Sequence, residues 1–250
     1  MPNDRMIDAP TNLAGLWPDS DDDDNTPFED NGEEQVVSVC GVDLKIRQYA
    51  YHSHNANRVW PGTFNLCEYY LSPTPPTGDL SSLKGKSVLE LGSATGLLAC
   101  RMKLAGVLNI ATSDVADGGS VKENVLYNFA LNGVDAVPHV EHTWGTGWSE
   151  GGYDVVLASD ILLYVKAYDA LVKTLGEIGG QVVMSWNRRM EESKEFFRKM
   201  EEAGWTWRHE GNCIYIFDKK EGGAEGGKEG GVEGGKGGGT ERQVETSRDK

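Results

Sequence analysis

Residues 86–203 alternate short apolar segments with longer segments of helical periodicity, and this alternation restricts the fold more than any other feature of the sequence. Five strands are predicted, at about 86–91, 108–113, 136–142, 153–159 and 179–186. Four helices are predicted between and after them, at about 96–105, 117–132, 166–176 and 190–203. Strands that alternate with helices pair in parallel and are covered on both faces, so we predict an open α/β sheet.

Shorter elements flank this region on both sides. An N-terminal β-hairpin is predicted at about 35–40 with 42–46, and a helix is predicted to begin at Pro61. A late hairpin, at about 205–209 with 213–217, is predicted to complete the sheet. The segment between Ser72 and Gly85 is rich in proline and is interpreted as a connection.

Both ends of the chain have compositions that cannot bury a core. Residues 21–24 form an acidic run, and residues 221–239 repeat Gly-Gly pairs that use eleven of the 32 glycines. We therefore expect a disordered acidic tail at 1–33, one domain at 34–218, and a disordered Gly-, Glu- and Lys-rich tail at 219–250. Each tail is interpreted as a solvated tether, with an interaction handle as the alternative.

The acidity of the chain lies mainly in its N-terminal segment. The net charge is −15, of which residues 1–35 carry −10 and residues 218–250 carry −1, so the region between them carries −4. A region this close to neutral has no strongly basic face, which disfavours nucleic acid as a partner.

The sequence also indicates a cellular setting. It contains no run of 18 apolar residues, no basic and apolar secretory signal, and no basic transit peptide. Its four cysteines form no CxxC motif, so they are expected to be reduced thiols. We therefore expect an intracellular protein, cytoplasmic or nuclear, that does not associate with membranes.

Residues 87–97 carry the sharpest functional signal, because an apolar strand, a turn of small residues and a helix follow one another directly. Small residues let the backbone approach a ligand, and a helix N-terminus offers unpaired N–H donors. The turn has Gly92, Ala94 and Gly96 in a G-x-A-x-G spacing, which disfavours the G-x-G-x-x-G nicotinamide site. A tight β–α turn without a ligand is the alternative.

Two acidic residues fall at the ends of predicted strands. Asp114 lies 18 residues after Gly96, a spacing that lets a carboxylate reach the hydroxyls of a ribose. Asp160 ends the fourth strand. Ligands of open α/β sheets bind beyond the C-terminal ends of the strands, so these groups are predicted to meet in one crevice, whereas any single acid could simply cap a helix.

Together these residues make the chain similar to a known family. The segment Glu90 to Gly96 resembles the S-adenosylmethionine motif of seven-stranded, class I methyltransferases, and the chain resembles the family-16 lysine-methyltransferase-like group over about 35–218. The further residues that carry this resemblance are Val59, Trp60 and Pro61, then Asn124, Asn128 and Asn132, then Trp144 and Gly145, Asp160 and Tyr164, and Trp186 to Arg189.

The resemblance implies a Rossmann-like sheet with helices on both faces and S-adenosyl-L-methionine as the cofactor. It implies that Asp114 holds the ribose, that Trp144 packs beside the adenine and that Trp60 lies near the entrance. It also implies that Ser159 lies beside the methionine part of the cofactor. The residues implied to cradle that part are Glu90, Gly92, Ser93, Ala94, Thr95 and Gly96. Packing in the core is the alternative for both tryptophans.

Two departures from the family pattern are visible. Ala94 replaces the middle glycine, and a methyl group is tolerated there only if φ stays negative, so cofactor affinity could fall without vanishing. The Asp-x-x-Tyr element of the family is one residue longer here, from Asp160 to Tyr164, so Tyr164 is offset from the tyrosine of the family.

Other patterns in the sequence are less specific. Asn124, Asn128 and Asn132 share one helix face, which either makes hydrogen bonds or is solvated. Arg188 and Arg189 either contact the substrate or begin a helix. The histidine pairs lack a third ligand at a plausible spacing, so no metal site is expected at His52 with His54 or at His139 with His142.

The leading interpretation is a protein-lysine methyltransferase that takes a protein substrate. In this hypothesis Asp160 orients the amine at the crevice, Tyr164 lines the channel and water accepts the proton. Two alternatives remain: a methyltransferase for small amines, and a catalytically silent member that binds cofactor and acts as a scaffold.

Overall fold

The computed structural model describes residues 32–73, 78–187 and 191–220. Most of the two predicted tails, residues 1–31 and 221–250, lies outside the described residues, and so do Arg188 and Arg189. In the described part, no helix is long and apolar enough to cross a lipid bilayer.

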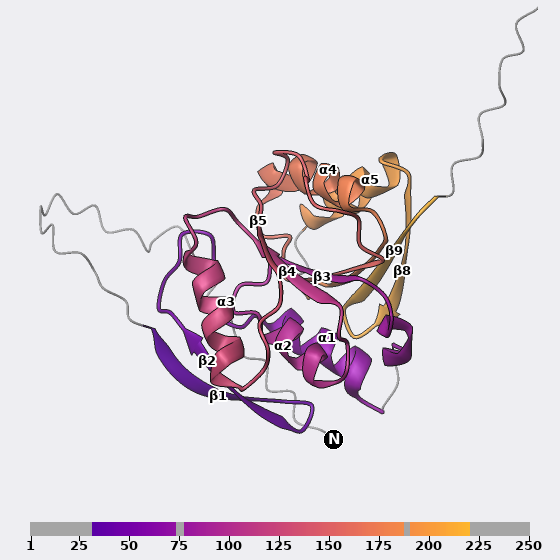
Figure 1. Ribbon diagram of the computed structural model, residues 1–250. Helices are drawn as coiled ribbons and strands as arrows, with labels where there is room; N and C mark the ends of the chain where they lie inside the picture. Colours follow the sequence, from indigo (N-terminus) through magenta and orange to yellow (C-terminus); the bar gives the residue numbers. More distant parts are fainter. Residues whose placement is uncertain (1–31, 74–77, 188–190, 221–250) are drawn as a thin grey trace, which may run out of the picture.

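A seven-stranded mixed sheet forms the centre of the protein (Figure 1). Its order is β5-β4-β3-β6-β7-β9-β8, with the first five parallel and β9 antiparallel to both of its neighbours. This confirms the Rossmann-like α/β fold and the late hairpin that completes the sheet. The strands are β3 Val88–Leu91, β4 Ile110–Asp114, β5 His139–Glu141, β6 Val155–Ser159, β7 Gln181–Ser185, β8 Trp205–Gly211 and β9 Ile214–Lys219.

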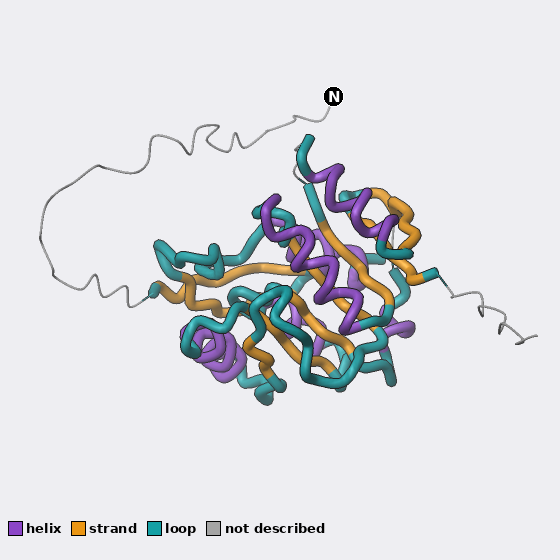
Figure 2. Tube along the Cα trace, turned by 90° about the horizontal axis from the view of Figure 1, so that it is seen from above, coloured by secondary structure: helices purple, strands orange, loops and turns teal. Residues whose placement is uncertain are grey.

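Helices cover both faces of the sheet, as Figures 1 and 2 show. One face is covered by α1 Pro61–Leu71, α2 Leu97–Leu104 and α3 Ser120–Leu131, and the other by α4 Tyr168–Ile178 and α5 Ser193–Glu202. Two short 3-10 turns, Leu80–Leu83 and Val165–Ala167, were not predicted from the sequence.

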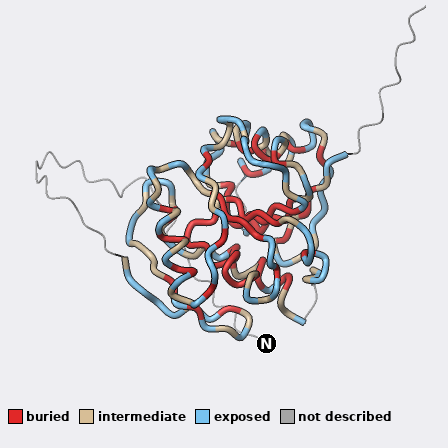
Figure 3. The backbone as a smooth tube through the Cα atoms, viewed as in Figure 1, coloured by how far each residue is buried: buried red, intermediate tan, exposed pale blue. Residues whose placement is uncertain are grey.

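The central strands are buried on both faces, so their side chains alternate between two cores. On β6, Val155 and Leu157 join the core beneath α1, α2 and α3, whereas Val156 and Ala158 join the core beneath α4 and α5. Figure 3 shows this buried interior between more exposed layers. A strand that is apolar at every position is what a parallel sheet with two covered faces requires.

The predicted N-terminal hairpin forms a separate two-stranded sheet, β1 Glu33–Val39 and β2 Val42–Gln48, beside α3. Asparagine side chains attach it to that helix. Asn132 accepts from the Lys45 N–H at 2.9 Å and donates to the Lys45 carbonyl at 2.7 Å. Asn128 makes the same pair of bonds to Arg47, at 2.7 and 3.3 Å.

The asparagine face of α3 therefore makes hydrogen bonds, which was one of the two alternatives open from the sequence. Asn124 completes the series by accepting from the Arg47 Nε at 2.8 Å. Four residues of helix rise about 6 Å and two residues of strand rise about 6.6 Å, so Asn132 and Asn128 meet the backbone of Lys45 and Arg47, two positions apart on β2.

Candidate functional site

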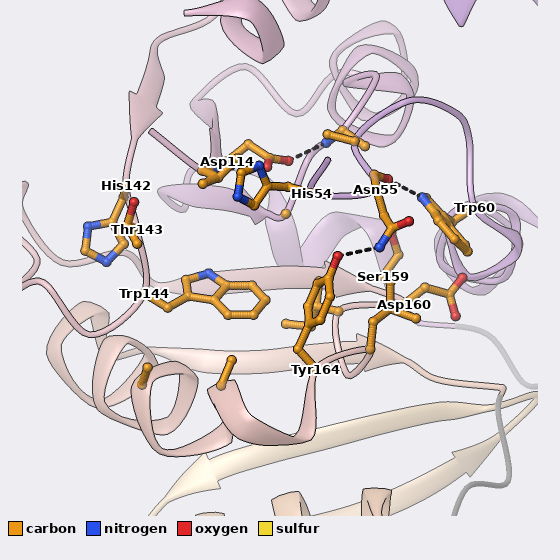
Figure 4. Close-up of a pocket in the computed structure, with 18 residues that line it drawn as sticks. His54, Asn55, Trp60, Asp114, His142, Thr143, Trp144, Ser159, Asp160 and Tyr164 are labelled. Atoms are coloured by element: carbon orange, nitrogen blue, oxygen red, sulfur yellow. Dashed lines mark hydrogen bonds between the residues drawn. The ribbon is translucent and has the colours of Figure 1, made fainter. Parts of the chain in front are cut away.

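A pocket of about 260 Å³ lies at the C-terminal edge of the parallel strands (Figure 4). Segments that follow four adjacent strands form its wall, together with the loop before α1. These segments meet because the C-terminal ends of parallel strands share one edge of the sheet. The lining segments are Gly92 with Ala94, Asp114 with Val115, His142 to Trp144, Ser159 to Tyr164 except Leu162, His54 to Ala56 with Trp60, and Ala167 with Ala170 at the start of α4.

Most residues predicted for the site lie in this pocket. The lining includes Trp60, Gly92, Ala94, Asp114, Trp144, Ser159, Asp160 and Tyr164. Four predicted residues are not part of the lining, namely Glu90, Ser93, Thr95 and Gly96. Of these four, Glu90, Ser93 and Thr95 are nearly fully buried.

The turn after β3 has three residues with left-handed backbone, Gly92 (φ 73), Ala94 (φ 47) and Gly96 (φ 74). A Cβ on Gly92 would lie 2.7 Å from Cγ2 of Ile161, so this position has no room for a side chain. A Cβ on Gly96 would lie 2.9 Å from Cγ1 of Val125 on α3. Gly96 therefore serves the packing of a helix.

Ala94 does not meet the condition of a negative φ. Its left-handed conformation directs its N–H towards Asp114, which accepts it through Oδ2 at 2.7 Å. A left-handed alanine costs about 1 kcal/mol, and the bond to a carboxylate offsets this cost.

Asp114 is held by two backbone groups at once. Its second oxygen, Oδ1, accepts the N–H of Val115 at 2.8 Å. Burial raises the pKa of this carboxyl, while the bonds from Ala94 and Val115 act in the opposite direction. The side chain is thus fixed in the pocket wall, where the spacing from Gly96 predicted it.

Glu90 lies behind the turn, with 2% of its surface exposed. Its Oε2 accepts the N–H of Ala99 at 2.9 Å, in the first turn of α2, so the carboxyl satisfies a backbone donor of that helix. Burial raises the pKa of Glu90 from 4.5 to about 8. Glu90 therefore keeps its proton over much of the neutral range.

Asp160 joins the pocket to α1. Its Oδ2 accepts the N–H of Gly62 at 2.5 Å, and its backbone is left-handed with φ 52. A Cβ on Gly62 would lie 2.8 Å from that oxygen, so the approach requires glycine. Next to this contact, the hydroxyls of Thr63 and Ser159 lie 3.2 Å apart.

The loop before α1 forms the remaining side of the pocket. The carbonyl of Asn55 accepts from Trp60 Nε1 at 2.9 Å, and the Asn55 amide donates to the hydroxyl of Tyr164 (Figure 4). Tyr164 is 42% exposed. Despite its offset from the family tyrosine, it lines the pocket.

Sequence reasoning missed ten lining residues. Val115, His142 and Thr143 follow strand ends, so the strand-end rule could have found them. Ile161 also follows a strand end, and the others carry no local signal, because tertiary folding brings them to the pocket: His54, Asn55, Ala56, Leu163, Ala167 and Ala170.

The histidines make ordinary side-chain contacts. His142 lies 3.2 Å from the hydroxyl of Thr174, and burial lowers its pKa. His52 pairs with Asp117 at 3.1 Å. Among the described residues, no group of three or more side chains could hold a metal ion.

Known proteins resemble this chain in sequence and in fold. A family model described as lysine methyltransferase matches residues 40–203. EEF1A lysine methyltransferase 3 from Xenopus tropicalis is 28% identical over 172 residues, which cover 66% of this chain and 73% of that protein. Protein N-lysine methyltransferase METTL21A from Danio rerio is 32% identical over 125 residues, which cover 47% of this chain and 57% of that protein.

A solved structure supports the same fold. The 16S rRNA N2 G1207 methyltransferase RsmC of T. thermophilus, in complex with AdoMet and guanosine, has a TM-score of 0.54 and 15% sequence identity, covering 76% of this chain and 50% of that chain. The family match includes every residue that lines the pocket. This chain belongs to the lysine methyltransferase family.

Proposed function

We propose that this protein binds S-adenosyl-L-methionine in the pocket and transfers its methyl group to lysine side chains of a protein acceptor. The observation that carries the proposal is the pocket itself. The pocket is lined by a carboxylate, two tryptophans and a turn in which Gly92 has no room for a side chain. It lies at the strand edge where α/β sheets bind ligands. Membership of the lysine methyltransferase family supports lysine as the acceptor.

The residues of the turn fit such a cofactor. Gly92 lets the turn lie close to the other wall of the pocket, because a Cβ there would meet Ile161. The buried hydroxyl of Ser93 has no hydrogen-bond partner among the described residues, which is costly unless a ligand or water satisfies it. Both features are expected of a turn that approaches a polar ligand.

In this proposal each wall of the pocket holds a different part of the cofactor. Asp114 accepts hydrogen bonds from the ribose hydroxyls, because its carboxylate is already fixed by Ala94 and Val115. Trp144 packs against the adenine, since aromatic faces stack on flat rings. The methionine part lies along the turn from Gly92 to Gly96, with Glu90 behind the turn and Ser159 and Trp60 beside it.

S-Adenosylmethionine supplies an activated methyl group on a positively charged sulfur. The protein aligns the acceptor with it and excludes water. Asp160 accepts an N–H of the incoming amine and orients the lone pair, while Tyr164 lines the path of the side chain. A lysine amine has a usual pKa of about 10.4, so it must first lose a proton, and water at the open rim accepts it.

Calorimetry on the full chain tests the cofactor site. We expect S-adenosylmethionine to bind with micromolar affinity and NADH not to bind. Asp114→Ala is expected to weaken binding by about tenfold or more, the effect of losing charge-assisted hydrogen bonds. Asp154→Ala is the matched control, because this exposed carboxylate binds Ser87 at the opposite ends of the strands. Equal affinity in the wild type and Asp114→Ala would contradict the site.

Transfer of labelled methyl groups tests the acceptor. Incubation with a cell lysate should label protein bands and leave small metabolites unlabelled, and mass spectrometry should place the label on lysine. Because a relative is named EEF1A lysine methyltransferase 3, EEF1A is the first purified acceptor to assay. Label confined to small molecules would contradict a protein acceptor.

A further inference from the structure

The loop between β2 and α1 is fastened at two places near the pocket. The N–H of Tyr49 donates to the carbonyl of Asn57 at 2.8 Å, which closes the base of the loop. His52 reaches Asp117 beyond β4, with 3.1 Å between Nε2 and Oδ2. The residues between these contacts, 53–56, are thereby held at the pocket, and three of them line it.

Asn55, in this part of the loop, contacts both aromatic side chains of the rim. Its backbone is left-handed with φ 59, a conformation that asparagine tolerates better than most residues. Its carbonyl accepts from the indole N–H of Trp60, and its amide donates to the hydroxyl of Tyr164. Figure 4 shows Asn55 between the two rings, with both interactions drawn.

Tyr164 depends on this contact for a fixed position. At 42% exposure its ring has little packing on the solvent side, so the hydrogen bond restricts rotation about its side-chain bonds. Trp60 is fixed from the other side by the carbonyl of the same residue. One residue thus sets the separation of two aromatic side chains at the pocket rim.

We propose that Asn55 is a positioning residue that holds Tyr164 so that a gap for the acceptor lysine stays open beside the Tyr164 ring. The inference rests on the proposed function and adds the path of the acceptor to it. Aromatic faces suit both the apolar stem and the cationic head of lysine. A preset gap lets the lysine bind without first ordering the tyrosine, which lowers the cost of binding.

Asn55→Gly is the informative variant. Glycine adopts the left-handed backbone and keeps the carbonyl that binds Trp60, so only the amide that binds Tyr164 is lost. We expect the KM for the acceptor to rise about fivefold, the effect of losing one partly exposed hydrogen bond, with little change in kcat. Tyr164→Phe should raise KM by a similar factor, and the double variant should be no worse than either single variant.

Asn57→Ala is the matched control. Asn57 holds the base of the same loop through the carbonyls of Tyr49 and Ala50 but does not line the pocket. We expect a lower melting temperature and a KM effect that simply adds to that of Tyr164→Phe. This separates general loosening of the loop from loss of the Asn55 amide.

The assay uses the protein band that the wild type labels, with the affinity for S-adenosylhomocysteine measured by calorimetry in parallel. Two results together would support the proposal. All variants should bind S-adenosylhomocysteine within about twofold of the wild-type affinity, and the KM effects of Asn55→Gly and Tyr164→Phe should not add in the double variant. An unchanged KM in Asn55→Gly, or a KM effect that persists in the Tyr164→Phe background, would overturn it. A wild type that binds no cofactor and labels no protein would refute the proposed function itself, and the inference with it.

Discussion

The two sides of the sheet both have apolar cores, and one of them also carries a polar attachment. Beneath α4 and α5 the contacts are apolar and largely aromatic, with Phe196 at edge-to-face distances of 5.7 Å from Tyr168 and 5.8 Å from Phe217. On the other side, the hairpin is attached to α3 through asparagine amides that bind the backbone of β2. Apolar packing stabilises without fixing direction, whereas amide pairs fix register.

This difference matters for the pocket because the polar attachment reaches the turn after β3. Asn128 also donates to the carbonyl of Thr95 at 3.0 Å, so the hairpin, α3 and the turn after β3 share one amide. We infer that the aromatic side mainly supplies stability and that the amide side also positions the site. Two substitutions test this contrast, and a third tests the raised pKa of Glu90 behind the turn.

Phe196→Ala should have the largest effect on stability. The ring is fully buried, and its removal leaves a cavity beneath α4 and α5. We expect a loss of about 3–5 kcal/mol in the free energy of unfolding, measured with denaturant. Cofactor affinity of the remaining folded protein should stay close to wild type, and a drop larger than that of Asn128→Ala would contradict the contrast.

Asn128→Ala should cost less stability and more affinity. The substitution leaves the N–H and carbonyl of Arg47 and the carbonyl of Thr95 without this partner, a loss of about 2 kcal/mol. Because Thr95 belongs to the turn, calorimetry should show weaker binding of S-adenosylmethionine. Asn132→Ala is the control, since it binds Lys45 at a more exposed place and does not contact the turn. If both variants bind equally well, the amide side does not position the site.

Glu90→Gln should change the pH dependence of stability. The pKa of Glu90 is raised in the folded protein from 4.5 to about 8, so its contribution is fully present below about pH 4.5 and is lost as the pH rises towards 8. In that range the wild type should lose up to about 1.4 kcal/mol per pH unit through this group. Glutamine does not titrate, and denaturation curves at several pH values should show a shallower dependence. Parallel curves for the two proteins would refute the raised pKa.

The fold could be predicted closely because its signals are local. Each predicted strand and helix is present, with shifts of a few residues at the ends, since the alternation and the glycine turn mark them. The position of Asp114 followed from its distance to Gly96. The asparagine face could be located but not interpreted, because its partners on β2 lie about 80 residues earlier in the chain.

The finer geometry of the site was beyond sequence reasoning. The left-handed Ala94 depends on a bond to Asp114, and nothing near Ala94 in the sequence indicates it. Asn55 reaches the pocket only because its loop folds against the segment after β6. There it contacts Tyr164, which lies 109 residues later in the chain. Such contacts arise from tertiary packing, and the types and spacings of residues along the chain do not reveal them.

The contact between Asp160 and Gly62 has an electrostatic consequence for the charge of the ligand. The N-terminus of a helix carries a partial positive charge and ordinarily attracts anions. Here the first turn of α1 points its Gly62 N–H at a carboxylate that itself lines the pocket. The carboxylate cancels the helix field at that wall, so a sulfonium and an ammonium can be brought together where a bare helix end would favour phosphate.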